Sequence, residues 1–345
     1  MRQLTFPPAL AITSLLSSTA VAALDLNDQL TLDGLVEVEA SYVQPDTGDS
    51  TSDVRVATVE LGVTAQVNPW VAATVSLLYE QDETDLEVDI AQITLANPER
   101  LPWFATAGQF YLPFGSFETQ LVSDPLTLEL GEIRATALQV GFKQHGVTAS
   151  MFAFNGDHAH SDDSDDSDDT QVDRWGGQVG FAAGDESTAI SWSVDLGYLS
   201  DLGDTGSLQD VIVSDDSTAA WTVAAGAKFG AVQVIGEYLA ATDRFDAGTL
   251  DYRDHGARPA TWNVEAGYHF KLLGRDNVAA IGYQGSREAL AVELPKQRWL
   301  IGWSAEVFKQ TTLALEWSRD TDYERRAGGT GETSDSVVAQ LAVSF

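Results

Sequence analysis

The sequence predicts a closed, antiparallel transmembrane β-barrel of about sixteen strands, and three observations lead to this fold class. The chain alternates apolar and polar residues with a period of two from residue 30 almost to its last residue. Its connections alternate between short and long, and its first 23 residues have the pattern of an export signal. Strands of about ten residues with this alternation, tight turns at one end and long loops at the other are typical of outer-membrane barrels.

Residues 1–23 form the predicted signal peptide. Arg2 is the only charged residue in this stretch, and an apolar, serine-containing segment follows it. Ala20-Val21-Ala22 supplies a small-x-small cleavage pattern, so we expect cleavage after Ala22 or Ala23. This leaves residues 24–345 as a single pore domain. Because only a few residues separate the signal from the first strand, we expect no globular plug of the kind that precedes the barrel in TonB-dependent receptors.

Composition excludes several classes of protein. The 19 Lys and Arg residues face 52 Asp and Glu residues, a formal net charge of −33, and such a chain would repel nucleic acid. There is no cysteine, which excludes a disulfide framework and a thiolate metal site. After the signal no run of 18 apolar residues occurs, so a membrane-spanning helix is not expected.

The strands follow from the alternation. In the segment 32–42, for example, Val36, Val38 and Tyr42 fall on one face, with Glu37 and Glu39 on the other. The pattern slips near Ala91 and Gln92, where we expect a β-bulge. The sixteen predicted strands are 30–43, 54–67, 70–81, 86–95, 103–112, 135–144, 146–154, 172–183, 188–200, 219–229, 231–241, 260–271, 277–285, 296–308, 311–319 and 335–345.

The last strand, VVAQLAVSF, explains how the barrel closes. Val337, Ala339, Leu341, Val343 and Phe345 form one apolar stripe that ends in an aromatic residue. Closure is required because an open edge in lipid would leave backbone groups without hydrogen bonds. An even number of strands puts both termini on the periplasmic side. The strand resembles the closing strand of Gram-negative outer-membrane proteins, which ends in Phe and is read by the barrel-assembly machinery, so Phe345 is the predicted assembly signal.

A soluble β-sandwich is the main alternative, because its strands also alternate. The strands here are too many and too long for that fold, the loops alternate in length, and the signal implies export.

The connection 113–134 is the most informative loop. It is long, it is punctuated by Pro113, Gly115, Pro125 and Gly131, and its apolar side chains would be poorly placed in open water. We expect this third outward loop to fold into the lumen and narrow it; the alternative is a loop that caps the rim or packs on a neighbouring subunit. Opposed acidic and basic side chains at this constriction would set a transverse electric field. The residues predicted to form the constriction are Phe114, Phe117, Glu118, Asp124, Glu129, Glu132 and Arg134.

Carboxylates recur on the faces predicted to line the lumen. Together they would favour cations, as acidic rings do in pores, although any water-filled wall must be polar. They are Glu37, Glu39, Glu60, Glu87, Asp89, Glu265 and Glu316.

The run HAHSDDSDDSDD at 158–169 raises the question of a metal site. Carboxylate oxygens suit calcium, and the candidate ligands are Asp162, Asp163, Asp165, Asp166, Asp168 and Asp169. The spacing fits no EF-hand, however, and a run of like charges is typical of a solvated loop. We therefore predict no metal site and no cofactor; cation bridging to anionic lipopolysaccharide is the weaker role that remains.

An enzyme is not expected. The five histidines have no spacing that marks a nucleophile and its base, and no glycine-rich phosphate loop occurs.

Several segments resemble one family. GQFYLPFGSFETQLVSDPLTLELGEIRATALQVGF (108–142), with GLVEVEASY (34–42), VATVELGVTAQVN (56–68), LLYEQDETDLEVD (77–89) and FNGD (154–157), is similar to the LbtU-family siderophore porins. This resemblance implies an outer-membrane barrel that admits ferric siderophores without TonB. The alternatives are a general porin for small nutrients or ions and, from other classes, a barrel enzyme or a structural envelope protein. Expected partners are outer-membrane lipid, lipopolysaccharide, the assembly machinery and a ferric siderophore; formation of a homo-oligomer is left open.

Overall fold

The computed structural model describes residues 23–27, 29–156, 172–184, 188, 190–209, 211–212 and 217–345. The predicted signal peptide, apart from Ala23, and the aspartate run 162–169 lie outside the described residues. Within these ranges, no helix combines the length and the apolar character that crossing a membrane requires.

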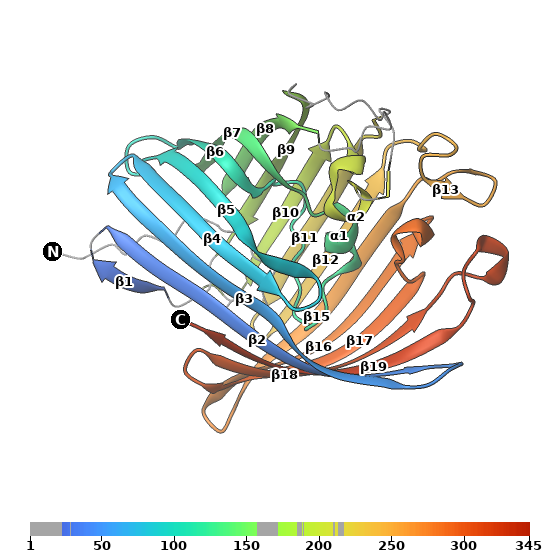
Figure 1. Ribbon diagram of the computed structural model, residues 1–345. Helices are drawn as coiled ribbons and strands as arrows, with labels where there is room; N and C mark the ends of the chain where they lie inside the picture. The colour runs from blue at the N-terminus through green and yellow to red at the C-terminus, as the bar shows by residue number, and fades with distance from the viewer. Residues whose placement is uncertain are drawn as a thin grey trace.

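Sixteen antiparallel strands form a closed ring in chain order, and the last pairs with the first (Figure 1). The strands of the ring are β2 (Leu30–Pro45), β3 (Thr51–Asn68), β4 (Val71–Glu80), β5 (Thr84–Ala96), β6 (Trp103–Tyr111), β7 (Arg134–Gln144), β8 (Val147–Asn155), β9 (Val172–Ala183), β10 (Ile190–Leu199), β11 (Ala220–Phe229), β12 (Val232–Ala241), β15 (Ala260–Leu272), β16 (Arg275–Arg287), β17 (Gln297–Phe308), β18 (Thr311–Thr321) and β19 (Thr333–Ser344).

Short elements complete the fold. A strand, β1 (Leu24–Asn27), pairs with β2, and β13 (Asp251–Tyr252) pairs with β14 (His255–Gly256) in the loop after β12. The helical elements are α1 (Leu126–Gly131), α2 (Gly206–Gln209), η1 (Leu202–Asp204), η2 (Leu290–Val292) and η3 (Arg325–Ala327).

The predicted fold class is confirmed, and each predicted strand ends within three residues of the observed one. The predicted bulge also occurs, but slightly earlier than expected. Ser76 pairs with Ile90 and Leu77 pairs with Val88, which leaves Asp89 as the extra residue. Because a bulge turns two successive side chains to one face, both Asp89 and Ile90 are buried on the inner side.

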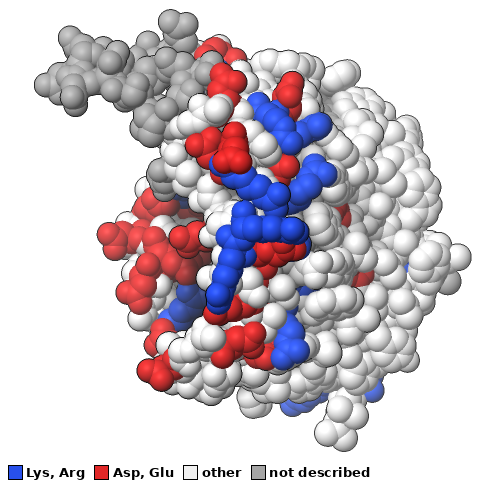
Figure 2. Space-filling view, turned by 90° about the vertical axis from the view of Figure 1, so that its right-hand side faces the viewer, with Lys and Arg blue, Asp and Glu red and all other residues white. Residues whose placement is uncertain are grey.

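The alternation separates an apolar outer face from an inner face that is more polar. On β2, Val36, Val38 and Tyr42 are exposed, whereas Glu37 between them is buried. Aromatic pairs such as Trp175 with Tyr198 pack across neighbouring strands on the outer face, near the ends that carry the long loops, with ring centroids 5.0 Å apart. Figure 2 shows the same division on the surface, where the charged side chains gather in a band beside a broad uncharged area.

The seam between β19 and β2 closes the ring. The two strands pair from Ser334 with Pro45 to Ser344 with Leu35, and the Phe345 and Gly34 backbones exchange hydrogen bonds of 2.8 and 3.0 Å. The Phe345 ring lies over Gly34, where an added Cβ would come 2.5 Å from ring atom Cζ. The last aromatic residue therefore packs against the first strand of the barrel.

Replacing Gly34 with Val should weaken this seam. The new side chain must displace the Phe345 ring, and we expect a loss of about 1–3 kcal/mol, as is usual for overpacking. The folded form should convert to the unfolded form at a lower temperature on an electrophoresis gel. Gly236→Val is the matched control, because a Cβ there has no atom nearer than 3.5 Å. Equal conversion temperatures for the two variants would contradict the role given to the Phe345 ring.

Candidate functional site: a channel constriction

The connection between β6 and β7, residues 112–133, is an ordered segment that carries α1. It runs against side chains that the strand alternation turns inward, and α1 contacts β12, β15 and β16 (Figure 1). We call this segment the constriction loop. Phe117 adopts a positive φ of 52°, which gives the backbone a sharp change of direction before the loop follows the wall.

An apolar cluster fixes both ends of the constriction loop. Phe114, Leu126 and Leu130 are fully buried, and they belong to a cluster that includes inward side chains of β8 and buried residues of the segment 199–212. The other buried members come from β6, β7 and β10 to β12, and from the loops after β12 and β16. Phe114 and Phe117, two of the residues predicted to form the constriction, are both buried within this cluster.

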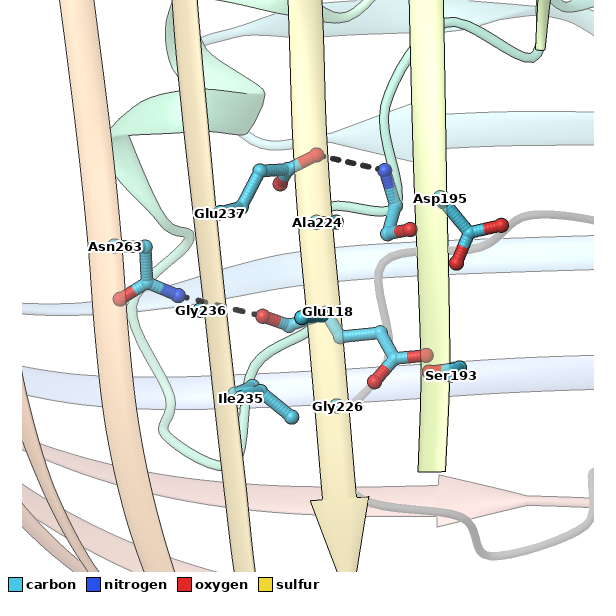
Figure 3. Close-up of a pocket in the computed structure, with 11 residues that line it drawn as sticks. Glu118, Ser193, Asp195, Ala224, Gly226, Ile235, Gly236, Glu237 and Asn263 are labelled. Atoms are coloured by element: carbon cyan, nitrogen blue, oxygen red, sulfur yellow. Dashed lines mark hydrogen bonds between the residues drawn. The ribbon is translucent and has the colours of Figure 1, made fainter. Parts of the chain in front are cut away.

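Three buried glutamates of the wall hold the loop by accepting hydrogen bonds from its backbone amides and side-chain hydroxyls. Glu237 on β12 accepts hydrogen bonds from the backbone amides of Ser116 (2.8 Å) and Phe117 (3.0 Å), and from the Thr127 hydroxyl (3.0 Å). In Figure 3 the Glu237 side chain reaches from β12 to the Ser116 backbone, while Asn263 donates to the Glu118 carbonyl at 3.4 Å.

The other two glutamates act on the tip of the loop, which we define as residues 118–124. Glu265 on β15 accepts from the Thr119 hydroxyl (2.9 Å) and the Gln120 amide (2.7 Å). Glu316 on β18 accepts from the Val122 amide (2.7 Å), the Ser123 amide (3.2 Å) and the Ser123 hydroxyl. Both carboxylates face inward as predicted, but they are almost fully buried. In this structure both carboxylates anchor the loop.

A steric seat adds an apolar contact at the tip. Leu121 is 1% exposed and lies over Gly282 on β16 and Gly302 on β17. A Cβ at Gly302 would come 2.5 Å from Leu121 Cδ2, and one at Gly282 would come 2.8 Å from Leu121 Cδ1. Only glycine at these two positions lets the tip lie this close to the wall.

A polar cavity of about 210 Å³ lies between the constriction loop and the wall formed by β2 to β6. The loop contributes Asp124 and Glu132, and the wall contributes further carboxylates but only one cationic side chain, Arg55. The acidic residues that line it are Glu37, Glu39, Glu60, Glu80, Glu83, Asp89, Asp124 and Glu132.

Ion pairs compensate part of this charge. Arg55 contacts Glu39 at 3.2 Å and also pairs with Glu83. Arg134 contacts Asp89 at 2.8 Å and Glu87 at 2.6 Å, so it neutralises carboxylates on its own side of the channel. In the described part of the chain five of the lining carboxylates have no ion pair, and these are Glu37, Glu60, Glu80, Asp124 and Glu132.

Opposed charges do occur, on the other side of α1. Glu129 points away from the cavity and interacts electrostatically with Arg298 of β17. Arg298 in turn forms two hydrogen bonds of 2.8 and 3.0 Å with Asp320. Glu132, by contrast, lies among other carboxylates of the cavity. Burial raises the pKa of Glu132, and the nearby Asp89 and Glu80 raise it further.

The remaining predicted residue, Glu118, faces a second and smaller pocket. Its carboxylate points toward β10, which carries Ser193 and Asp195 (Figure 3). The pocket holds about 10 Å³, which is room for about one water molecule. Among the described residues, no group of three or more His, Asp or Glu side chains is arranged to hold a metal ion.

Sequence reasoning missed Glu237, Leu121 and the two glycines of its seat. Glu237 carried a usable signal, because it is the one carboxylate among Ile235 and Leu239 on a strand face that is otherwise apolar. The two glycines carried no such signal, because their partner Leu121 is distant in the sequence. Gly282 lies 161 residues and Gly302 lies 181 residues after it.

The closed ring of sixteen antiparallel strands has the fold of a porin-like outer-membrane channel. OmpF of Salmonella typhi has the same architecture, with a TM-score of 0.62 at 15% identity over 94% of this chain and all of that one. The anion-selective porin of Comamonas acidovorans superposes with a TM-score of 0.61 at 14% identity, over 92% of this chain and 99% of that one. At these identities the likeness establishes the fold alone.

The chain belongs to the UPF0422 family. It is 30% identical over 327 residues to a UPF0422 protein of Coxiella burnetii, covering 90% of this chain and 69% of the relative. A UPF0422 protein of Legionella pneumophila (strain Paris), lpp3030, is 25% identical over 361 residues, covering 92% of this chain and 66% of the relative. The chain thus spans about two thirds of the length of these relatives. No family model matches it.

Proposed function

We propose that this protein is a passive channel across the outer membrane, narrowed by the constriction loop and selective for cations. The observation that carries the proposal is the cavity beside the loop, where eight carboxylates face one arginine. Carboxylates that line a water-filled passage concentrate cations and repel anions, because fixed charges act strongly between low-dielectric walls. The proposal puts the short turns, Leu24 and Phe345 on the periplasmic side, as in other outer-membrane barrels.

Iron complexes are the first cargo that we propose. The support is the resemblance to the LbtU-family siderophore porins, which is densest over residues 34–157 and most specific in the stretch PFGSFETQLVSDPLTLELGE of the constriction loop. The acidic cavity adds a specific expectation about charge. Cationic and neutral ferric complexes should enter more readily than anionic complexes of the same size.

Uptake tests this cargo. The protein is expressed in a Gram-negative host that lacks its ferric-siderophore receptors and has TonB disabled, and labelled ferric complexes of matched size and different charge are supplied. We expect uptake that depends on this protein and decreases from cationic to neutral to anionic complexes. Uptake fastest for the anionic complexes would contradict the acidic filter. No iron uptake through a barrel that conducts small ions would leave a general porin as the function.

The same proposal includes assembly of several copies of this barrel into an oligomer. Among the similar solved structures is a trimer form of OmpT from Vibrio cholerae, with a TM-score of 0.54 at 11% identity. The described residues form a complete ring within one chain, so a single copy already contains the channel.

A further inference from the structure

The tip of the constriction loop is held against the wall by groups that lose their charge in acid. Five hydrogen bonds from amides and hydroxyls of the tip are accepted by just two carboxylates, those of Glu265 and Glu316. Backbone amides donate more strongly to a carboxylate than to a neutral acid, because a hydrogen bond to a charged acceptor is about twice as strong. Protonation of these two side chains therefore weakens most of the polar contacts of the tip.

The groups around the two anchors act on their ionisation in opposite directions. Glu265 also accepts a hydrogen bond of 3.0 Å from Asn263 of its own strand, and Glu316 is its neighbouring charge. From β17, Arg298, which is paired with Asp320, acts on Glu316. From β16, Gln284 accepts from the Leu126 amide at 3.2 Å, beyond the tip.

Charges on the far side of the loop favour the held position while they are ionised. Asp124 and Glu132 of the loop share the cavity with Glu37, Glu60 and Glu80 of the wall. While these groups are ionised, they repel one another and push the loop away from β2 to β5, toward its anchors on β15 and β18. The same protons that weaken the anchors also remove this repulsion.

We infer that the constriction loop is an acid-closed gate, and this inference rests on the proposed channel function. At neutral pH the tip is held open by Glu265 and Glu316. In acid the tip leaves the wall and moves into the cavity, because the apolar cluster keeps both ends of the loop in place while the cavity offers the free volume. Leu121 in its glycine seat opposes this movement, so it sets how far the pH must fall before the channel closes.

The test is the passage of a neutral sugar and of ions as a function of pH. The purified full-length barrel is reconstituted in liposomes and in planar bilayers in 1 M KCl, where the Debye length is only about 3 Å and fixed charges affect conductance little. We expect both the sugar flux and the conductance to fall by more than half between pH 7 and pH 4. Glu265→Gln/Glu316→Gln should already be largely closed at pH 7, and Leu121→Ala should close at a higher pH than the native protein.

Glu99→Gln/Glu306→Gln is the matched control, because both glutamates lie away from the constriction loop, and it should keep the native pH profile. Hydrogen exchange on the native protein needs no variant: the amides of residues 118–124 should lose protection at pH 4 after correction for the intrinsic rate, while β12 keeps its protection. A channel that conducts at pH 7 and keeps its sugar flux and tip protection at pH 4 overturns the gate but not the channel. A folded barrel that conducts nothing at pH 7 overturns the channel itself.

Discussion

Removing three cavity carboxylates should abolish cation selectivity while leaving the barrel intact. We expect Glu60→Gln/Asp124→Asn/Glu132→Gln to lower the cation-to-anion permeability ratio toward the value for free ions in water. These three side chains face the passage and have no ion pair in the described part of the chain, so their charge acts on the permeating ions. The measurement is the zero-current potential across a planar bilayer under a KCl gradient of about 0.1 M against 0.01 M, where screening is weak.

The matched control removes the same number of charges elsewhere. Glu99, Asp254 and Asp276 are exposed and lie in or beside turns away from the cavity. The triple variant Glu99→Gln/Asp254→Asn/Asp276→Asn changes the net charge equally and should keep the native selectivity. If the two triple variants shift the potential by the same amount, the overall acidity of the chain produces the selectivity and the cavity does not.

Filling the seat under Leu121 should narrow the channel. In Gly282→Val/Gly302→Val the new side chains occupy the space that the Leu121 methyl groups now fill, at 2.8 and 2.5 Å from the ideal Cβ positions. The leucine must leave the wall, and the loop tip has only the cavity to move into. We expect a marked fall in single-channel conductance, and a loss of about 1–3 kcal/mol in stability because the core around the tip is overpacked.

A second variant separates the loss of the Leu121 seat from the general effect of replacing a strand glycine with valine. Gly236→Val adds the same side chain where the nearest atoms are 3.5 Å and more away, and it should conduct as the native protein does. Adding Leu121→Ala to the double valine variant should restore conductance, since the smaller side chain no longer has to move. Persistent narrowing in that triple variant would show that the glycines act on something other than Leu121.

The wall of this barrel could be predicted from the sequence because strand alternation is a local signal. Apolar residues that must face lipid recur at every second position, so Val36, Val38 and Tyr42 identify both the strand and its outer face. The constriction loop was visible for a similar reason, since a long connection rich in Phe and Leu must find an apolar environment.

The internal contacts could not be predicted in the same way. Glu265 and Glu316 look like any lumen carboxylate in the sequence, and their partners at Gln120 and Val122 lie 145 and 194 residues away. Which strand faces the loop depends on the register of the whole ring and on the turn at Phe117. The residues that cover Phe114 could not be named for the same reason, because several come from the distant segment 199–212.

The central claim is that the passage beside the constriction loop selects cations, and the zero-current potential of the native protein tests it most directly. A bilayer with the reconstituted barrel is placed between concentrated and dilute KCl at pH 9, above the raised pKa values of Asp124 and Glu132. If the unpaired carboxylates of the cavity control permeation, potassium crosses faster than chloride and the dilute side becomes positive. A potential near zero, or a dilute side that becomes negative, would contradict the account.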